Sequence, residues 1–112
     1  MAVVVAETEG EIVGFAALSP YRSRPAYSTT VEDSIYVRHD QRGNGVGRAL
    51  LAELVEVAAA RGFHTMMARI VGGHDASIGL HRSLGFELVG IEREVGRKFG
   101  RWLDVVLMQR ML

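Results

Sequence analysis

The chain has 112 residues, 48% of them hydrophobic, and its 13 lysines and arginines equal its 13 aspartates and glutamates in number. This length predicts one domain, residues 1–112, with a modest core of its own. The balanced charge excludes a broad electrostatic field for nucleic acid or an anionic membrane, so neither is an expected partner.

Cysteine is absent, which excludes disulfides, cysteine-ligated zinc and an acyl-cysteine intermediate. The four histidines are scattered without a pair at metal-ligand spacing, so no metal is expected. The apolar start, residues 1–6, is too short for a signal peptide and has no basic region before it. No apolar run approaches the length of a transmembrane helix. These features predict a cytoplasmic protein.

The first part of the chain predicts two strands in a hairpin. Residues 2–6 are a continuous β-branched run, Thr8–Gly10 predicts a turn, and residues 11–18 return as a second strand. Gly14 in this strand indicates a bulge or a close approach to another backbone.

A polar loop over residues 19–25, which includes Arg22 and Arg24, leads to a third predicted strand. This strand runs from Tyr27 to Val37 and is irregular in its first half. A helix over residues 49–61 follows, and Gly62 is expected to cap its end. Apolar residues of the helix region repeat at i, i+4 spacing, which is typical of a face turned toward a core: Val46, Leu50, Leu54 and Ala58, with Leu51 and Val55 beside them.

The second half of the chain predicts three strands and a short helix. Asp75 is expected to cap the short helix, which is expected to bury Ile78, Leu80 and Leu84. The order of strands and helices predicts an α/β (α+β) fold, a mixed sheet with helices packed on it. The elements are a strand over residues 64–71, a helix over 76–84, and strands over 86–95 and 102–111 joined by a basic, exposed turn, 96–101.

The stretch from Gln41 to Arg48 lies between the third predicted strand and the first helix. Its glycines at positions 43, 45 and 47 allow a sharp turn and the close approach of another group. The amides that open the helix have no partner inside it, and the helix dipole places partial positive charge there. A strand, a glycine turn and a helix N-terminus together predict an anion site, most naturally for phosphate.

Two common phosphate motifs do not fit this stretch. A P-loop requires Gly-Lys-Ser/Thr after its first glycine and four further residues, and that pattern is absent. A dinucleotide fingerprint requires G-x-G-x-x-G and an acidic residue about twenty positions later, but Gly47 comes one place early and residues 60–64 contain no acid. The stretch instead contains the pattern Arg42-x-x-Gly45-x-Gly47, which neither of these motifs describes. The alternative is a glycine turn that only caps an ordinary helix.

The pattern Arg42-x-x-Gly45-x-Gly47 resembles the acetyl-CoA loop of the GNAT superfamily of N-acetyltransferases. Further stretches in the same order are similar to the GNAT branch that includes phosphinothricin and methionine sulfoximine or sulfone acetyltransferases. They cover nearly the whole chain: Thr30 to Val37, Asp75-Ala76-Ser77-Ile78, Leu80-His81-x-x-Leu84-Gly85-Phe86, and Lys98-Phe99-Gly100-x-Trp102-x-Asp104-Val105.

The resemblance has two departures. Members of this branch begin with a strand and two helices before the point where this chain starts, about forty to fifty residues by ordinary element lengths. The resemblance therefore implies an N-terminally truncated GNAT-like domain: a fragment, a misassigned start or a short member. The second departure is His74, where the family commonly has an asparagine that contacts the pantetheine arm.

Acetyl transfer to an α-ammonium group is helped by a base. Glu32 lies four residues before Tyr36, so the two share one face of a regular strand. The resemblance implies that Glu32 is the base, that His81 protonates the departing thiolate, and that Arg24 and Tyr27 grip the acid group of the substrate. A surface carboxylate and an interfacial helix histidine are the structural alternatives for Glu32 and His81.

The resemblance implies acetyl-CoA as co-substrate, without a metal. Its pyrophosphate is expected on the glycine turn and its pantetheine arm on the end of the third strand. The donor-binding residues expected are Ile35, Tyr36, Val37, Arg42, Gly43, Asn44, Gly45, Val46, Gly47, Arg48, His74 and Ser77.

The sequence thus predicts an N-acetyltransferase that moves an acetyl group from acetyl-CoA to a small amino-acid-like amine by direct attack in a ternary complex. The alternatives are an inactive acyl-CoA-binding module and a partner subunit of a complete homologue. A homodimer is also expected, because an apolar edge strand at residues 1–6 tends to pair and because family members commonly dimerise through their C-terminal strands.

Overall fold

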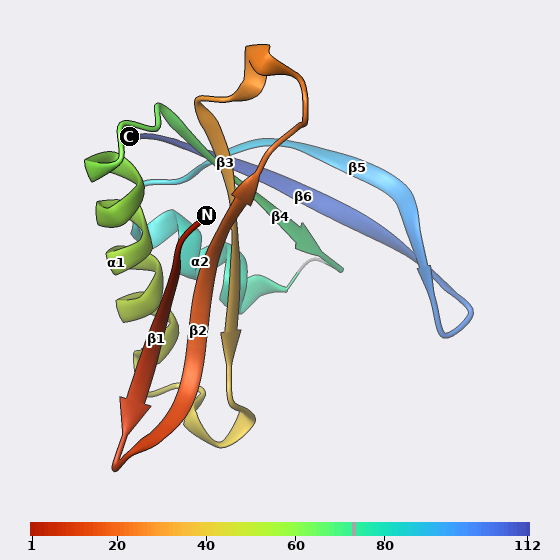
Figure 1. Ribbon diagram of the computed structural model, residues 1–112. Coiled ribbons are helices and arrows are strands. Elements are labelled where there is room, and N and C mark those ends of the chain that lie inside the picture. The colour runs from red at the N-terminus through yellow and green to blue at the C-terminus, as the bar shows by residue number, and fades with distance from the viewer. Residues whose placement is uncertain (73) are drawn as a thin grey trace.

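The computed structural model describes residues 1–72 and 74–112, and it contains a six-stranded sheet with two α-helices. The strand order across the sheet is β1-β2-β3-β4-β6-β5 (Figure 1). The predicted mixed sheet with packed helices is confirmed. The elements are β1 (Val3–Thr8), β2 (Glu11–Pro20), β3 (Thr30–Val37), α1 (Val46–Ala60), β4 (Thr65–Val71), α2 (Asp75–Ser83), β5 (Glu87–Lys98) and β6 (Arg101–Met111), with short 3-10 helices at Pro25–Tyr27 and His39–Gln41.

All neighbouring strands are antiparallel except β3 and β4, which are parallel. The predicted β1–β2 hairpin forms around Glu9 and Gly10, both at positive φ, as a two-residue primed turn requires. Gly14 has both features that its position suggested. The β1–β2 register shifts opposite it, and a Cβ built at Gly14 would lie 2.8 Å from the carbonyl oxygen of Tyr36.

The core lies between one face of the sheet and the two helices. The predicted apolar stripe of α1 is confirmed, because its middle residues are buried while Val46 is half-buried. Strands β3 and β4 contribute alternate residues to this core, as the period of a strand requires. The buried cluster includes Val31, Met66, Ala68, Ile70, Phe86, Val106 and Met108 together with Leu50, Leu51, Leu54, Val55 and Ala58 of α1.

Several details differ from the sequence expectations. The segment before Thr30 is a 3-10 turn and bend rather than an irregular strand, because Pro25 fixes its φ at a position suited to a helical turn. Asp75 is the first residue of α2 and His74 is its N-cap, without a side-chain cap hydrogen bond. Ile78, Leu80 and Leu84 are only half-buried, whereas His81 is the buried residue of α2.

The basic turn after β5 is also tighter than expected, because β5 runs on to Lys98 and only Phe99 and Gly100 connect it to β6. These two strands extend past the rest of the sheet as a long arm (Figure 1). Within the described parts of the chain, no helix is long and apolar enough to cross a membrane.

Candidate active site

The glycine turn lies at the N-terminus of α1. Gly43 and Gly45 have φ values of 85° and 79°, and nothing lies within 4 Å of a Cβ built on either. The positive φ therefore favours glycine at these two positions, although a side chain there would meet no neighbouring atom. Gly45 is the N-cap and offers no side-chain cap to the first amides of the helix. Those amides point out of the helix end and can bind an anion.

A cavity of about 420 Å³ lies over this turn. Gly47 is inside the helix, and a Cβ there would lie 3.5 Å from Leu80 and 3.6 Å from Val37, which is ordinary contact. The residues around the cavity come from the end of β3, the glycine turn and the start of α2. They include Ile35, Val37, Arg42, Gly43, Gly45, Val46, Gly47, Arg48 and Ser77, nine of the twelve positions expected to hold the donor.

The parallel strands β3 and β4 separate beside this cavity. They pair only through Thr30↔Thr65, Val31↔Met66 and Glu32↔Met67, and their ribbons diverge beyond Glu32 (Figure 1). The backbone of residues 33–37 is paired with β2 on one side and faces the opening on the other. An extended molecule with amide groups can therefore bind along this strand edge.

A second cavity, of about 330 Å³, occupies the opening between the two strands. It shares Ile35 and Ser77 with the cavity over the glycine turn, so the two form one groove along β3. His74, which the sequence predicts as a donor contact, lines the second cavity. The remaining lining residues are Asp33, Ser34, Arg69, Ile70, Val71 and His81.

His81 is 3% exposed, and both of its ring nitrogens have acceptors. Nδ1 lies 2.8 Å from the carbonyl oxygen of Ser77, and Nε2 lies 3.1 Å from Oδ2 of Asp33. A carbonyl and a carboxylate both accept hydrogen bonds, so both ring nitrogens can donate at the same time when the ring is protonated. Burial, the largest influence, lowers the pKa of His81, but Asp33 and the Ser77 carbonyl together raise it above its usual value.

Asp33 is the site residue that sequence reasoning missed. It belongs to β3 and His81 belongs to α2, 48 residues later, so no local spacing connects them. The only signal was a carboxylate between two apolar strand positions, Val31 and Ile35, on the face that turned out to be the core. A buried charge on such a face needs a partner of opposite sign.

Glu32 projects from the other face of β3. Its carboxylate Oε1 lies 4.0 Å from Nε of Arg69 in β4. Burial raises the pKa of Glu32 above its usual range, the neighbouring Asp33 adds to the rise, and Arg69 and Arg22 oppose it. Tyr36 lies on the same face and stacks on Phe15 of β2, with ring centroids 5.7 Å apart. Glu32 and Tyr36 are therefore on one face of β3, which is consistent with the prediction from the alternation of side chains along a strand.

The structure places Arg24 and Tyr27 apart from the donor groove. They line a cavity of about 320 Å³ together with Arg22 and Thr30. Tyr27 packs edge-on against Tyr21. Thr30 is the first residue of β3 and lies two residues before Glu32, so this cavity lies near Glu32 at the start of the strand. Within the described parts of the chain, no cluster of three or more histidine, aspartate or glutamate side chains is arranged to hold a metal ion.

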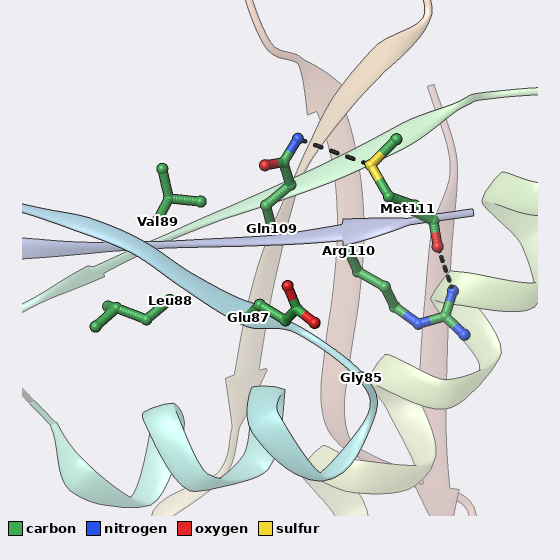
Figure 2. Close-up of a pocket in the computed structure, with 7 residues that line it drawn as sticks. All are labelled: Gly85, Glu87, Leu88, Val89, Gln109, Arg110 and Met111. Atoms are coloured by element: carbon green, nitrogen blue, oxygen red, sulfur yellow. Dashed lines mark hydrogen bonds between the residues drawn. The ribbon is translucent and has the colours of Figure 1, made fainter.

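One further cavity, of about 540 Å³, has a different setting. Figure 2 shows it beside the start of β5 and the end of β6. The Arg110 guanidinium there donates to the carbonyl oxygens of Leu84 and Met111, so it holds the end of β6 against the end of α2. This cavity shares no lining residue with the groove along β3.

Comparison with known proteins agrees with this geometry, a glycine turn at a helix N-terminus beside two separating parallel strands. Residues 1–86 match the model of the acetyltransferase (GNAT) family. The chain belongs to the GNAT family of acetyltransferases, and the predicted branch is confirmed by its similarity to named members.

A methionine sulfoximine and methionine sulfone acetyltransferase of Pseudomonas aeruginosa is 50% identical over 107 residues, 96% of this chain and 62% of the relative. The chain thus spans less than two thirds of that relative's length. A phosphinothricin acetyltransferase of Sinorhizobium meliloti, solved with acetyl-CoA, is 52% identical with a TM-score of 0.96, over 98% of this chain and 60% of that one. A ribosomal-protein-alanine N-acetyltransferase of Brucella melitensis is 50% identical with the same TM-score, over 98% and 68%.

Proposed function

We propose that this chain is an N-acetyltransferase that moves an acetyl group from acetyl-CoA to the amine of a small amino-acid-like substrate, by direct attack in a ternary complex. The observation that carries the proposal is the groove that runs from the glycine turn into the opening between β3 and β4. Relatives that are 50% or more identical and match most of this chain are named as N-acetyltransferases.

In this proposal the donor lies along the groove. Its pyrophosphate binds the free amides at the start of α1, where the helix dipole favours negative charge. Its pantetheine arm follows the unpaired edge of β3 past Ile35, with His74 and Ser77 on the opposite wall. The thioester then lies where the two strands part, next to Glu32 and Asp33.

Glu32 acts as the base on the acceptor side. The amine nitrogen attacks the acetyl carbonyl carbon, a C–N bond forms, and the proton that the nitrogen loses goes to the Glu32 carboxylate. The raised pKa of Glu32 supports this role, because a stronger carboxylate base accepts a proton more readily from an ammonium group.

His81 acts on the donor side. As the C–S bond breaks, the CoA thiolate takes the Nε2 proton that Asp33 otherwise accepts. The ring is then a neutral imidazole that still donates from Nδ1 to the Ser77 carbonyl. This proton transfer should raise the reaction rate only modestly, because the thiolate of a thiol with a pKa near 8.5 leaves tolerably well without a proton.

The acceptor class rests on the relatives' names and on the loop before β3. Arg24 and Tyr27 are proposed to bind the acid group of the acceptor, since a guanidinium fork matches an oxyanion. Their cavity reaches Thr30, two residues from the proposed base. The relatives' names give methionine sulfoximine, methionine sulfone, phosphinothricin and the alanine of a ribosomal protein as acceptors.

We further propose that residues 1–112 act as one domain and that the protein forms a homodimer. We also propose that it works in the cytoplasm, because its charged donor does not cross bilayers freely. Two apolar edges support the dimer: β1 exposes Val3 and Val5, and the arm of β5 and β6 exposes Val95 and Trp102. Sedimentation at tens of micromolar, roughly the range of interface affinities, tests it, and a clean monomer contradicts it.

The decisive experiment for the function combines calorimetry with CoA and a turnover assay with acetyl-CoA. The acceptors are methionine sulfoximine, methionine sulfone, phosphinothricin, standard amino acids and a peptide that begins with alanine. Acetylation of a free amino acid supports the proposal. CoA binding without turnover of any acceptor contradicts it and favours an acyl-CoA-binding module, and the absence of both favours a partner subunit.

A further inference from the structure

The open face of the sheet carries a line of three charged side chains, which come from three of four neighbouring strands. Arg69 of β4 lies between Glu32 of β3 and Glu92 of β5. Its Nη2 is 2.8 Å from Oε1 of Glu92, whereas its Nε is 4.0 Å from Oε1 of Glu32. The arginine is therefore hydrogen-bonded to one carboxylate and only in electrostatic reach of the other.

The strand register fixes this arrangement. Arg69 is two residues beyond Met67, the partner of Glu32, so it shares the open face with Glu32. Arg69 faces Leu107 of β6, and Glu92 pairs with Val105 of the same strand. Glu92 therefore reaches Arg69 diagonally across β6. All three side chains are between 27% and 39% exposed, so water screens them only in part.

Other charged groups near Glu32 are few among the described residues. Asp33, the next residue, raises the pKa of Glu32, and Arg22 from the loop after β2 lowers it less strongly than Arg69 does. On the β2 side the neighbouring Ser19 donates only to the backbone carbonyl of Glu32. Arg69 is thus the strongest positive influence on this carboxylate.

We propose that Arg69 is a positioning residue whose charge tunes the Glu32 carboxylate, and that Glu92 limits how much of the charge of Arg69 reaches Glu32. The proposal rests on the proposed function, in which Glu32 is the base. With Glu92 in place, Arg69 is largely neutralised and Glu32 stays a good proton acceptor. Without Glu92, the Arg69 side chain can move closer to Glu32. Its positive charge then makes the Glu32 carboxylate a weaker base.

This arrangement predicts shifts of opposite sign from two neighbouring substitutions. Arg69→Gln removes the positive charge that lowers the pKa of Glu32, so this pKa should rise. Glu92→Gln removes one negative charge and releases Arg69, so the pKa of Glu32 should fall. Each shift should be about half a pH unit or more, since a charge within ~4–6 Å commonly moves a carboxyl pKa by a unit or more when it is less exposed.

The test is a carboxyl-carbon NMR titration of Glu32 in the full chain for the parent, Arg69→Gln, Glu92→Gln and the double variant. Glu11→Gln is the matched control. It also removes a carboxylate from an exposed arginine pair, with Arg38, but at a site about six strand residues or 20 Å away. It should leave the Glu32 titration unchanged. In the double variant the Glu32 pKa should fall between those of the two single variants, because one positive and one negative charge are removed together.

A pH–rate profile in the same variants separates the inference from the function. The acid limb of kcat/KM should move with the Glu32 titration, so the rate at a fixed low pH changes about threefold for half a unit. Shifts of the same sign in both variants, or none in either, overturn the role of Arg69. If the Glu32 pKa shifts in opposite directions in the two variants but the acid limb of kcat/KM does not move, the charge network is confirmed and Glu32 is not the base. If Arg69→Gln does not fold, the predicted fall in Glu92→Gln still decides.

Discussion

Glu32 and Asp33 are consecutive in the chain, yet their carboxylates lie on opposite faces of the sheet. Glu32 faces Arg69 on the open side, and Asp33 binds His81 on the helix side. The two positions coincide with the point where β3 and β4 stop pairing. In the proposed reaction, a thioester in that opening has the Glu32 carboxylate on the side of the incoming amine and the Asp33-bound His81 ring on the side of the leaving thiolate.

Asp33→Asn tests the buried pair. The pKa of His81 is raised in the folded chain, so the pair stabilises the fold fully below the unfolded pKa near 6.5 and loses this contribution as pH rises through the folded value. We expect the variant to lose about 2 kcal/mol of unfolding free energy at about pH 5.5, and less at about pH 9. Urea denaturation across this range measures the difference. A loss that is equal at every pH would show that charge is not the cause.

Gly45→Val tests the donor site. The valine adopts an unfavourable positive φ and places its side chain where the pyrophosphate is proposed to bind. CoA affinity should fall at least tenfold, about 1.4 kcal/mol, by calorimetry. Gly62→Val is the matched control, because Gly62 also has positive φ and an open surrounding, at the other end of α1. It should lose similar stability and keep its affinity for CoA.

Gly47→Val separates space from strain at the same site. Gly47 is not at positive φ, and its Cβ would make only ordinary contacts with Leu80 and Val37. The circular dichroism spectrum should therefore persist while CoA binding weakens, also by about tenfold or more. Parent-like CoA affinity in both Gly45→Val and Gly47→Val would remove the glycine turn from the donor site.

Glu32→Gln and His81→Ala test the acid–base roles. Glu32→Gln should lower the rate on an α-amine by about a hundredfold or more, because general-base help is typically worth that much. The loss should shrink as pH rises, since the free amine then forms without a base. CoA affinity should hold, and the Tm should not fall, because burial disfavours the ionised form of Glu32. A parent-like rate and pH profile would exclude Glu32 from the mechanism.

His81→Ala should cost less in rate than Glu32→Gln, because the thiolate leaves tolerably without a proton. It should cost more in stability, since it leaves the Asp33 carboxylate buried without its partner. The Tm and the pH–rate profile of the two variants, measured side by side, check both orders. A larger rate loss in His81→Ala at matched folded fractions would mean that protonation of the thiolate limits the reaction.

Gly14→Ala tests the close approach of β2 and β3. The added Cβ would meet the Tyr36 carbonyl oxygen at 2.8 Å and a methyl group of Leu50 at 3.1 Å. The strand must shift to relieve this overlap, so we expect a loss of about 1–3 kcal/mol in unfolding free energy, as for other overpacked sites. A variant as stable as the parent in urea would show that the sheet yields there at little cost.

Most of the elements, the core face of α1 and the glycine turn could be predicted from the sequence. These are local features: the i, i+4 repeat from Leu50 to Ala58 and the positive φ of Gly43 and Gly45 depend on neighbours in the chain. The sequence also placed Glu32 and Tyr36 on one strand face, because strand alternation is local as well. The tertiary structure decided which charges meet. Asp33 finds His81, and Arg69 lies between Glu32 and Glu92, only because β3, β4, β5 and α2 are brought together across the sheet. Electrostatic partners depend on distance in space, and spacing along the chain carries no information about pairs that are dozens of residues apart.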